Sequence, residues 1–151
     1  MRARKAPPTI AKLSRPVLHR AVPRERLFSL LDLHRVQRRG ICIVGPPGAG
    51  KTTLLGSWLA ARKVPGIWYQ VDPGDADLST FFYYLAQAAE GFRKPRQRAL
   101  PLLLPEYLGD VLGFARRFFR EFFARLPAGA VVAFDNYQEV SPDEIFHQIV
   151  A

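Results

Sequence analysis

Cysteine, acidic residues and long apolar runs are all scarce in this chain of 151 residues. A single cysteine excludes an intrachain disulfide, and three dispersed histidines give no zinc-ligand spacing. No apolar run is long enough to cross a bilayer, and no hydrophobic signal core follows the basic first residues. We therefore expect a cytoplasmic protein without membrane contact, in which Cys42 is a small buried side chain.

The shortage of acidic residues leaves a strongly basic chain. Its 22 lysines and arginines against 13 aspartates and glutamates give a net charge of +9. The basic residues are scattered over several segments, and those between Arg116 and Arg125 fall on the polar side of a predicted helix. A solvated helix face is the ordinary interpretation of that pattern. Direct nucleic-acid binding through the basic residues remains one alternative function.

Short apolar runs alternate with segments of helical periodicity, which is typical of an α/β protein. Residues 1–23 are rich in proline and basic side chains and are predicted to be an extended lead-in. Residues 93–105 break the helical pattern and are predicted to be a loop. The predicted strands cover 40–44, 67–71 and 130–134, and the predicted helices cover 24–36, 51–62, 78–92, 107–126 and a last segment opening near Ser141 and Pro142, with Asp143 and Glu144 in its first turn.

Apolar side chains at three- and four-residue spacing mark the faces that these helices should bury. The first helix should bury Leu27, Leu30, Leu31 and His34. The helix capped by Asp77 should bury Leu78, Phe81, Phe82, Leu85, Ala89 and Phe92. The helix at 107–126 should bury Leu108, Val111, Leu112, Ala115, Phe118, Phe119, Phe122 and Leu126, with Phe123 at the margin.

A glycine-rich loop lies between the first predicted strand and the helix at 51–62. It satisfies the pattern G-x-x-x-x-G-K-[ST], in which glycines let backbone N–H groups converge on phosphate oxygens. The helix start adds a partial positive charge. Lys51 would contact the β- and γ-phosphates of ATP, and the Thr52 hydroxyl would bind Mg²⁺. The predicted nucleotide ligands are Gly45, Pro46, Pro47, Gly48, Ala49, Gly50, Lys51, Thr52 and Thr53.

An acidic residue at the end of another buried strand is the second part of such a site. Asp135 follows the apolar run 131–134 and is predicted to hold Mg²⁺ together with Thr52. A turn-capping role for Asp135 is the alternative interpretation. Asp72 and Asp75 follow the strand at 67–71, and for them a turn or capping role is favoured over contact with the nucleotide.

Several motifs in order resemble the ATPase module of the large LuxR-type transcriptional activators typified by the maltose regulator, which are signal-transduction ATPases of the STAND class. They are Lys12-Leu13-Ser14-Arg15-Pro16, Val22 with Arg24-Glu25-Arg26-Leu27, the glycine loop, Ile67 to Asp72 with Asp75 and Phe81 to Leu85, and Phe134-Asp135-Asn136-Tyr137. The resemblance implies a P-loop NTPase three-layer sandwich around a parallel sheet, with Val22 and Arg24 near the adenine. It also implies ATP-dependent self-association of the full-length regulator, and DNA binding through a domain outside this chain.

Two departures from that family bear on activity. Asn136 stands where the family usually has a second acid, and an amide cannot accept a proton from water. Glu139 is a possible replacement base, although an exposed loop glutamate is the more ordinary interpretation. We therefore expect ATP binding with slow or absent hydrolysis, with Asn136 and Glu139 as the candidate catalytic positions.

The second departure is length. The family resemblance implies a further strand between those that carry the glycine loop and Asp135, so residues 24–151 are expected to be a partial domain, incomplete at its C-terminal side. Three functions stay open: an ATP-binding switch of a transcriptional regulator, a stand-alone small P-loop kinase or NTPase, and a nucleic-acid-binding segment.

Overall fold

The computed structural model describes residues 10–142 and 144–151, which divide into two compact units. The first unit contains the described residues up to Ser14 together with Pro65–Ala151, and the second contains Arg15–Val64. Residues 1–9 of the predicted lead-in lie outside the described residues. Within the described part, no helix is both long and apolar enough to span a membrane.

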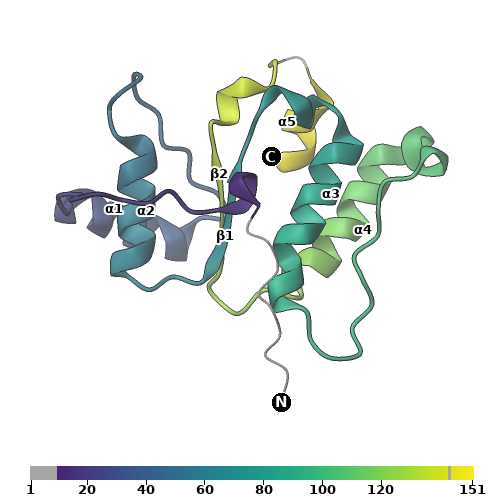
Figure 1. Cartoon of the computed structure of the whole chain (residues 1–151), viewed down its shortest axis with the longest axis horizontal. Helices are drawn as coiled ribbons and strands as arrows, with labels where there is room; N and C mark the ends of the chain where they lie inside the picture. Colours follow the sequence, from purple (N-terminus) through teal and green to yellow (C-terminus); the bar gives the residue numbers. More distant parts are fainter. Residues whose placement is uncertain (1–9, 143) are drawn as a thin grey trace. The chain divides into compact units, whose positions relative to one another are not determined.

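A two-stranded parallel sheet is the centre of the first unit (Figure 1). Strand β1 (Gly66–Gln70) pairs with β2 (Val131–Asp135), in a register that sets Gly66 opposite Val131 and Gln70 opposite Asp135. Parallel strands need a crossover connection. Here it contains α3 (Leu78–Ala89) and α4 (Val111–Phe123), so the mixed helix and strand content agrees with the predicted α/β class.

Aromatic side chains fill the space between this sheet and its helices. Ile67 and Tyr69 alternate along β1 and join the core cluster, as expected for one face of a strand, and Val71, directly after the strand, joins it too. Phe82 of α3 lies 5.0 Å from Phe114 of α4, between ring centroids. Phe81 lies at the same distance from Phe146 of α5 (Ile145–Val150). The other fully buried phenylalanines of this core are Phe118 and Phe122.

Helix α3 follows the sequence prediction up to Ala89, after which Glu90–Phe92 form a 3₁₀ turn with Phe92 partly buried, and α4 departs from the prediction. Asp77 caps α3 by accepting a hydrogen bond from the Ser79 N–H at 3.1 Å. Helix α4 begins at Val111 rather than at 107, because a 3₁₀ turn (Pro105–Asp110) comes first. Leu108 and Leu112 were predicted to be buried and are exposed, Leu108 by 59%. The buried stripe follows the four-residue spacing of Phe114, Phe118 and Phe122, and the prediction missed Phe114.

The loop at 93–105 and the last helix agree with the prediction in part. The loop at 93–105 has no α-helix, as predicted, although Leu100 and Leu103 enter the core. Helix α5 begins at Ile145, not near Ser141, because Glu144 has an extended backbone (ψ 144°). Asp143 of the predicted first turn lies outside the described residues.

The second unit contains helices α1 (Glu25–Gln37) and α2 (Lys51–Ala61). Asp32 of α1 accepts hydrogen bonds from Trp58 Nε1 at 2.8 Å and from Arg62 Nε at 2.9 Å. These bonds lower the pKa of the Asp32 carboxyl, and the hydrogen bond from Trp58 makes the largest contribution. The prediction for the buried face of α1 was partly wrong, because the helix turns Phe28 and Leu31 inward. Leu30 and His34, predicted to be buried, are exposed.

The predicted strand at 40–44 is not found. No residue of this segment belongs to a strand, Val44 is 88% exposed, and Cys42, predicted to be buried, is also exposed. A β-branched run becomes a strand only when a neighbouring strand pairs with its N–H and C=O groups. In the part of the chain that the structure describes, only β1 and β2 are paired in a sheet.

Candidate functional site

The glycine loop of the second unit has two residues with left-handed backbones and leads into helix α2. Gly48 and Gly50 both have left-handed backbones, with φ of 78° and 79°. Gly50 is the N-cap residue of α2, which starts at Lys51. The first N–H groups of a helix have no partner within it, and they carry the positive end of the helix dipole. The loop therefore leads directly into a helix start that favours an anion.

The Lys51 side chain lies against the loop that precedes it. Its Nζ donates to the carbonyl oxygens of Gly45 at 2.8 Å and Pro46 at 3.1 Å. The loop itself is closed by a hydrogen bond from the Ala49 N–H to the Pro46 carbonyl at 3.2 Å. The predicted phosphate ligand is thus held at the loop by contacts that lie within nine residues of sequence.

Arg24 adds a second cation to the loop. Its Nη1 donates to the Ala49 carbonyl at 3.2 Å, and its Nη2 lies 3.1 Å from the position that a Cβ on Gly50 would take. Glycine at 50 is therefore favoured both by its positive φ and by the approach of Arg24. Val22, predicted beside the adenine with Arg24, is 79% exposed.

The charge of this loop is positive. Lys51 and Arg24 contribute two cations, and the first turn of α2 has no acidic side chain. Thr52 is half-buried in that turn, and Thr53 is exposed. The second unit thus has three groups that could interact with a polyanion, namely a helix start, two cations and a hydroxyl.

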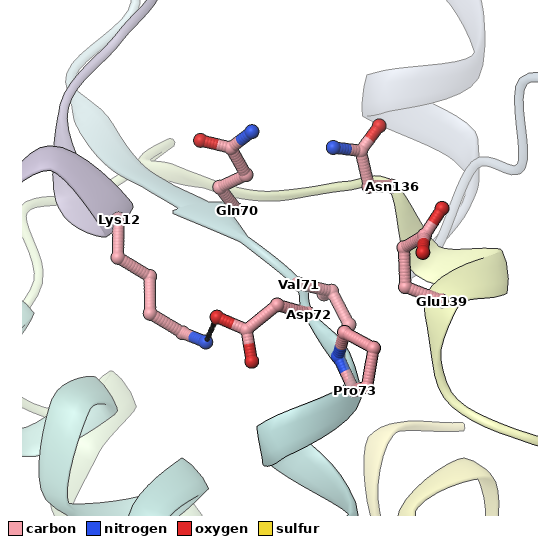
Figure 2. A pocket seen from close by; sticks show the side chains of 7 residues that line it. All are labelled: Lys12, Gln70, Val71, Asp72, Pro73, Asn136 and Glu139. Atoms are coloured by element: carbon pink, nitrogen blue, oxygen red, sulfur yellow. Dashed lines mark hydrogen bonds and ion pairs between the residues drawn. The ribbon is translucent and has the colours of Figure 1, made fainter.

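A separate pocket of about 330 Å³ lies in the first unit, where both strands end (Figure 2). Its lining residues are Lys12, Gln70, Val71, Asp72, Pro73, Asn136 and Glu139. The two candidate catalytic residues, Asn136 and Glu139, therefore line the same pocket. Figure 2 shows the Gln70 amide, from the end of β1, projecting on the same side as the Asn136 amide.

Asp135 and Asn136 have different backbone conformations at the end of β2. Asp135 is the last residue of the strand, and its carbonyl accepts a hydrogen bond from the Val71 N–H at 2.9 Å. Its Oδ1 accepts from the Asn136 N–H at 3.1 Å. Asn136 has a left-handed backbone (φ 56°), which asparagine adopts more readily than most residues other than glycine. This conformation gives a physical reason for an amide at this position.

A partly buried ionic cluster flanks the pocket. Lys12 is paired with both Asp72 and Asp75, and its Nζ lies 2.8 Å from Oδ2 of Asp75. Asp75 is fully buried and also accepts from the Tyr69 hydroxyl at 2.6 Å and the Asp72 N–H at 2.9 Å. Asp72 and Asp75 form a capping box on the turn Pro73–Ala76, so the predicted capping role is confirmed.

This cluster also shifts two pKa values. Burial, followed by the hydrogen bond to Asp75, raises the pKa of the Tyr69 hydroxyl far above its usual value. The hydrogen bond from Lys12 lowers the pKa of the Asp72 carboxyl. Lys12 also lies 5.3 Å from the centre of the Tyr69 ring and 5.4 Å from that of Tyr84, within cation–π range.

The structure groups the predicted site residues by unit. Arg24, the glycine loop, Lys51 and Thr52 belong to the second unit, whereas Asp135, Asn136 and Glu139 belong to the first. Sequence reasoning missed Gln70 and Lys12 as pocket residues. The only signal for Gln70 was a polar side chain at the end of an apolar strand. Among the described residues, no group of three or more His, Cys, Asp or Glu side chains could hold a metal ion.

Comparison with known proteins relates part of the chain to a transcriptional regulator. The chain is 42% identical over 81 residues to the HTH-type transcriptional regulator MalT of Cronobacter sakazakii. The match covers 53% of this chain and 9% of that regulator, so the chain corresponds to a small part of the relative's length. Neither a family profile nor a solved structure matches the chain. Over about half of its length, the chain is thus related to MalT-type transcriptional regulators.

Proposed function

We propose that this chain is the ATP-binding switch module, of the STAND class, of a transcriptional regulator. In that role, nucleotide occupancy controls conformation, and the regulator's self-association and its contact with DNA depend on parts outside this chain. The similarity to MalT, whose name describes a transcriptional regulator, supports this role. The expected fold is a P-loop sandwich to which the observed parallel pair β1 and β2 would belong.

The observation that carries the proposal is the geometry of the glycine loop. Two left-handed glycines, Gly48 and Gly50, lead into a helix whose first residue is the lysine of the motif. Glycine tolerates this backbone without strain, and the helix start that follows favours phosphate. A glycine-rich turn without a phosphate role would not require a lysine and a threonine at the first two helical positions.

The residues present fit a magnesium nucleotide. Lys51 and the N–H groups at the start of α2 would hold the phosphates, and Arg24 supplies further positive charge at the loop. The Thr52 hydroxyl is the expected Mg²⁺ ligand in this unit, and Asp135 is proposed as the acidic ligand. When bound, Mg²⁺ neutralises phosphate charge and fixes the orientation of the chain of phosphates.

Turnover is proposed to be slow. The amide of Asn136 cannot act as a general base. Glu139 lines the same pocket as Asn136, and its exposed carboxylate is the nearest candidate in sequence. A switch that stays in its ATP-bound state does not need rapid hydrolysis, which agrees with an amide at position 136.

Binding of ATP and ADP in the presence of Mg²⁺ tests the proposal. Lys51→Ala should weaken ATP affinity by at least about tenfold, because a charged contact to phosphate is lost. Arg39→Ala is the matched control, since it removes one exposed positive charge from the same unit. Asp135→Asn should reduce the Mg²⁺ dependence of binding. Equal ATP affinity for the parent chain and for Lys51→Ala would contradict the proposal.

Phosphate release separates a switch from an enzyme. We expect less than one turnover per minute from the parent chain, which is about sixtyfold or more below the low end of typical enzymes. Glu139→Gln should abolish whatever release remains if Glu139 activates water. Release that continues at enzyme-like rates would instead favour a stand-alone NTPase.

A further inference from the structure

A basic turn follows α3 in the first unit and is braced by its own hydrogen bonds. The Gln97 N–H donates to the Lys94 carbonyl at 3.1 Å, and Arg93 Nε donates to the Gln97 carbonyl at 2.8 Å. Pro95 and the left-handed Arg96 (φ 68°) occupy the two central positions, which is the pattern of a type II turn. The turn, residues 93–98, presents the exposed side chains of Arg93, Lys94, Arg96 and Arg98.

A buried arginine supports this turn. Arg125 is 4% exposed and donates from Nη2 to the Arg98 carbonyl at 2.6 Å. Its Nε and Nη1 are buried and have no hydrogen-bond partner within the described part of the chain. Buried guanidinium N–H groups normally find an acceptor, because leaving them unpaired is energetically costly. The unpaired groups therefore need an explanation beyond packing.

One carboxylate lies between Arg125 and the basic turn. Glu90 Oε2 is 3.3 Å from Arg93 Nη1, and Glu90 Oε1 is 4.0 Å from Arg125 Nη1. The first distance is a weak hydrogen bond, and the second is too long for one. Across residues 10–142 and 144–151, no ion pair is found for Lys94, Arg96 or Arg98. Glu90 therefore lies near two of the five cations, Arg93 and Arg125.

We propose that the basic turn binds a phosphate oxyanion, and that binding transfers Glu90 from Arg93 to Arg125. The phosphate would accept hydrogen bonds from Arg93 and its exposed neighbours, since guanidinium groups match phosphate geometry. Glu90, released from Arg93, moves to Arg125 and accepts from the N–H groups that lack a partner. The site is separate from the glycine loop and does not depend on the proposed ATP binding.

Inorganic phosphate is the first probe, titrated into the full 151-residue chain carrying Lys51→Ala so that the glycine loop does not contribute. NMR of the arginine Nε–Hε groups follows the two states. We expect saturable shifts of the Arg93 and Arg125 signals at millimolar phosphate or below, which is the range of a small anion held by a few charged hydrogen bonds. A short DNA duplex is the second probe, because its backbone presents the same phosphate chemistry.

Two substitutions outside the buried core test the exchange, at the exposed Arg93 and the partly buried Glu90. Arg93→Gln should weaken phosphate binding by about tenfold through loss of one charged contact. Glu90→Gln should tighten it, because a competing carboxylate is removed. Arg116→Gln is the matched control, since Arg116 is exposed on α4 and outside the basic turn. It should leave the phosphate affinity unchanged.

Each outcome decides a specific point. Saturation with phosphate identifies free phosphate as sufficient, and saturation only with the duplex identifies a nucleic-acid backbone as the source. An Arg125 Nε–Hε signal that does not respond while Arg93 does would overturn the transfer of Glu90. Equal weakening by Arg93→Gln and Arg116→Gln, or no saturable response to either probe, would overturn the site and leave Arg125 as a structural clamp.

Discussion

Replacing Lys12 by methionine should destabilise the first unit by about 3 kcal/mol. Methionine keeps much of the apolar stem but removes the ammonium group that lies 2.8 Å from the fully buried Asp75 carboxylate. Removing one partner of a buried ion pair costs about 3–5 kcal/mol, because the other charge stays buried. Asp75 keeps hydrogen bonds from Tyr69 and from the Asp72 N–H, so the low end of that range applies. Asp72 is more than half exposed and contributes little.

Hydrogen exchange of the Val71 N–H reports this loss locally, because that group donates to Asp135 across the sheet. A loss of about 3 kcal/mol corresponds to exchange that is about a hundredfold faster, when the exchange rate is set by the equilibrium between the closed and the open state. Lys94→Met, an exposed lysine of the same unit, is the matched control and should change exchange by less than about threefold.

A double-mutant cycle isolates the charge pair. Asp75→Asn in the Lys12→Met background removes the uncompensated charge and should recover part of the lost stability. The reasoning would be refuted if Lys12→Met accelerated Val71 exchange by less than about fivefold, or if the effects of the two substitutions were additive.

Three further outcomes are expected. Lys12 lowers the pKa of the Asp72 carboxyl. The contribution of Asp72 to stability is therefore present above its pKa in the unfolded chain, about 3.9, and is lost as the pH falls through its lower pKa in the folded chain. Measuring the Val71 exchange rate during acid titration checks this. In thermal unfolding, Gly50→Ala should destabilise the second unit by about 1–2 kcal/mol through backbone strain, and it should also displace Arg24. Gly48→Ala has open space around the new Cβ and should show the effect of backbone strain alone. Asp77→Ala should cost about 1 kcal/mol in urea unfolding through loss of the α3 cap.

Local sequence patterns were sufficient for much of the fold. The predicted strands 67–71 and 130–134 are found one residue away from their expected bounds, as β1 and β2, and the segments after Gly50 and Asp77 are helices. In each case the signal lies within the element or its cap. The glycine loop is also a local feature, since its backbone conformation and its contact with Lys51 involve neighbouring residues, and its role in binding phosphate stays a prediction.

Features that depend on distant partners were not predicted. The run 40–44 has a strand-like composition, but pairing, not composition, makes a strand. The pocket brings Lys12 beside Asp72, 60 residues further along the chain, and no local pattern encodes that contact. The buried face of α4 was misjudged because a preceding 3₁₀ turn changes where the helix begins, and hence which leucines face the core.

The left-handed backbone of Asn136 limits which acidic residue this position could hold. Glutamate has no short polar group to stabilise that backbone, so Asn136→Glu would combine a new carboxylate with strain at the end of β2. Aspartate tolerates the conformation better and retains most of the asparagine shape. Selection of variants for faster ATP turnover should therefore recover aspartate at position 136 before glutamate, or a glutamate accompanied by changes that reshape the turn.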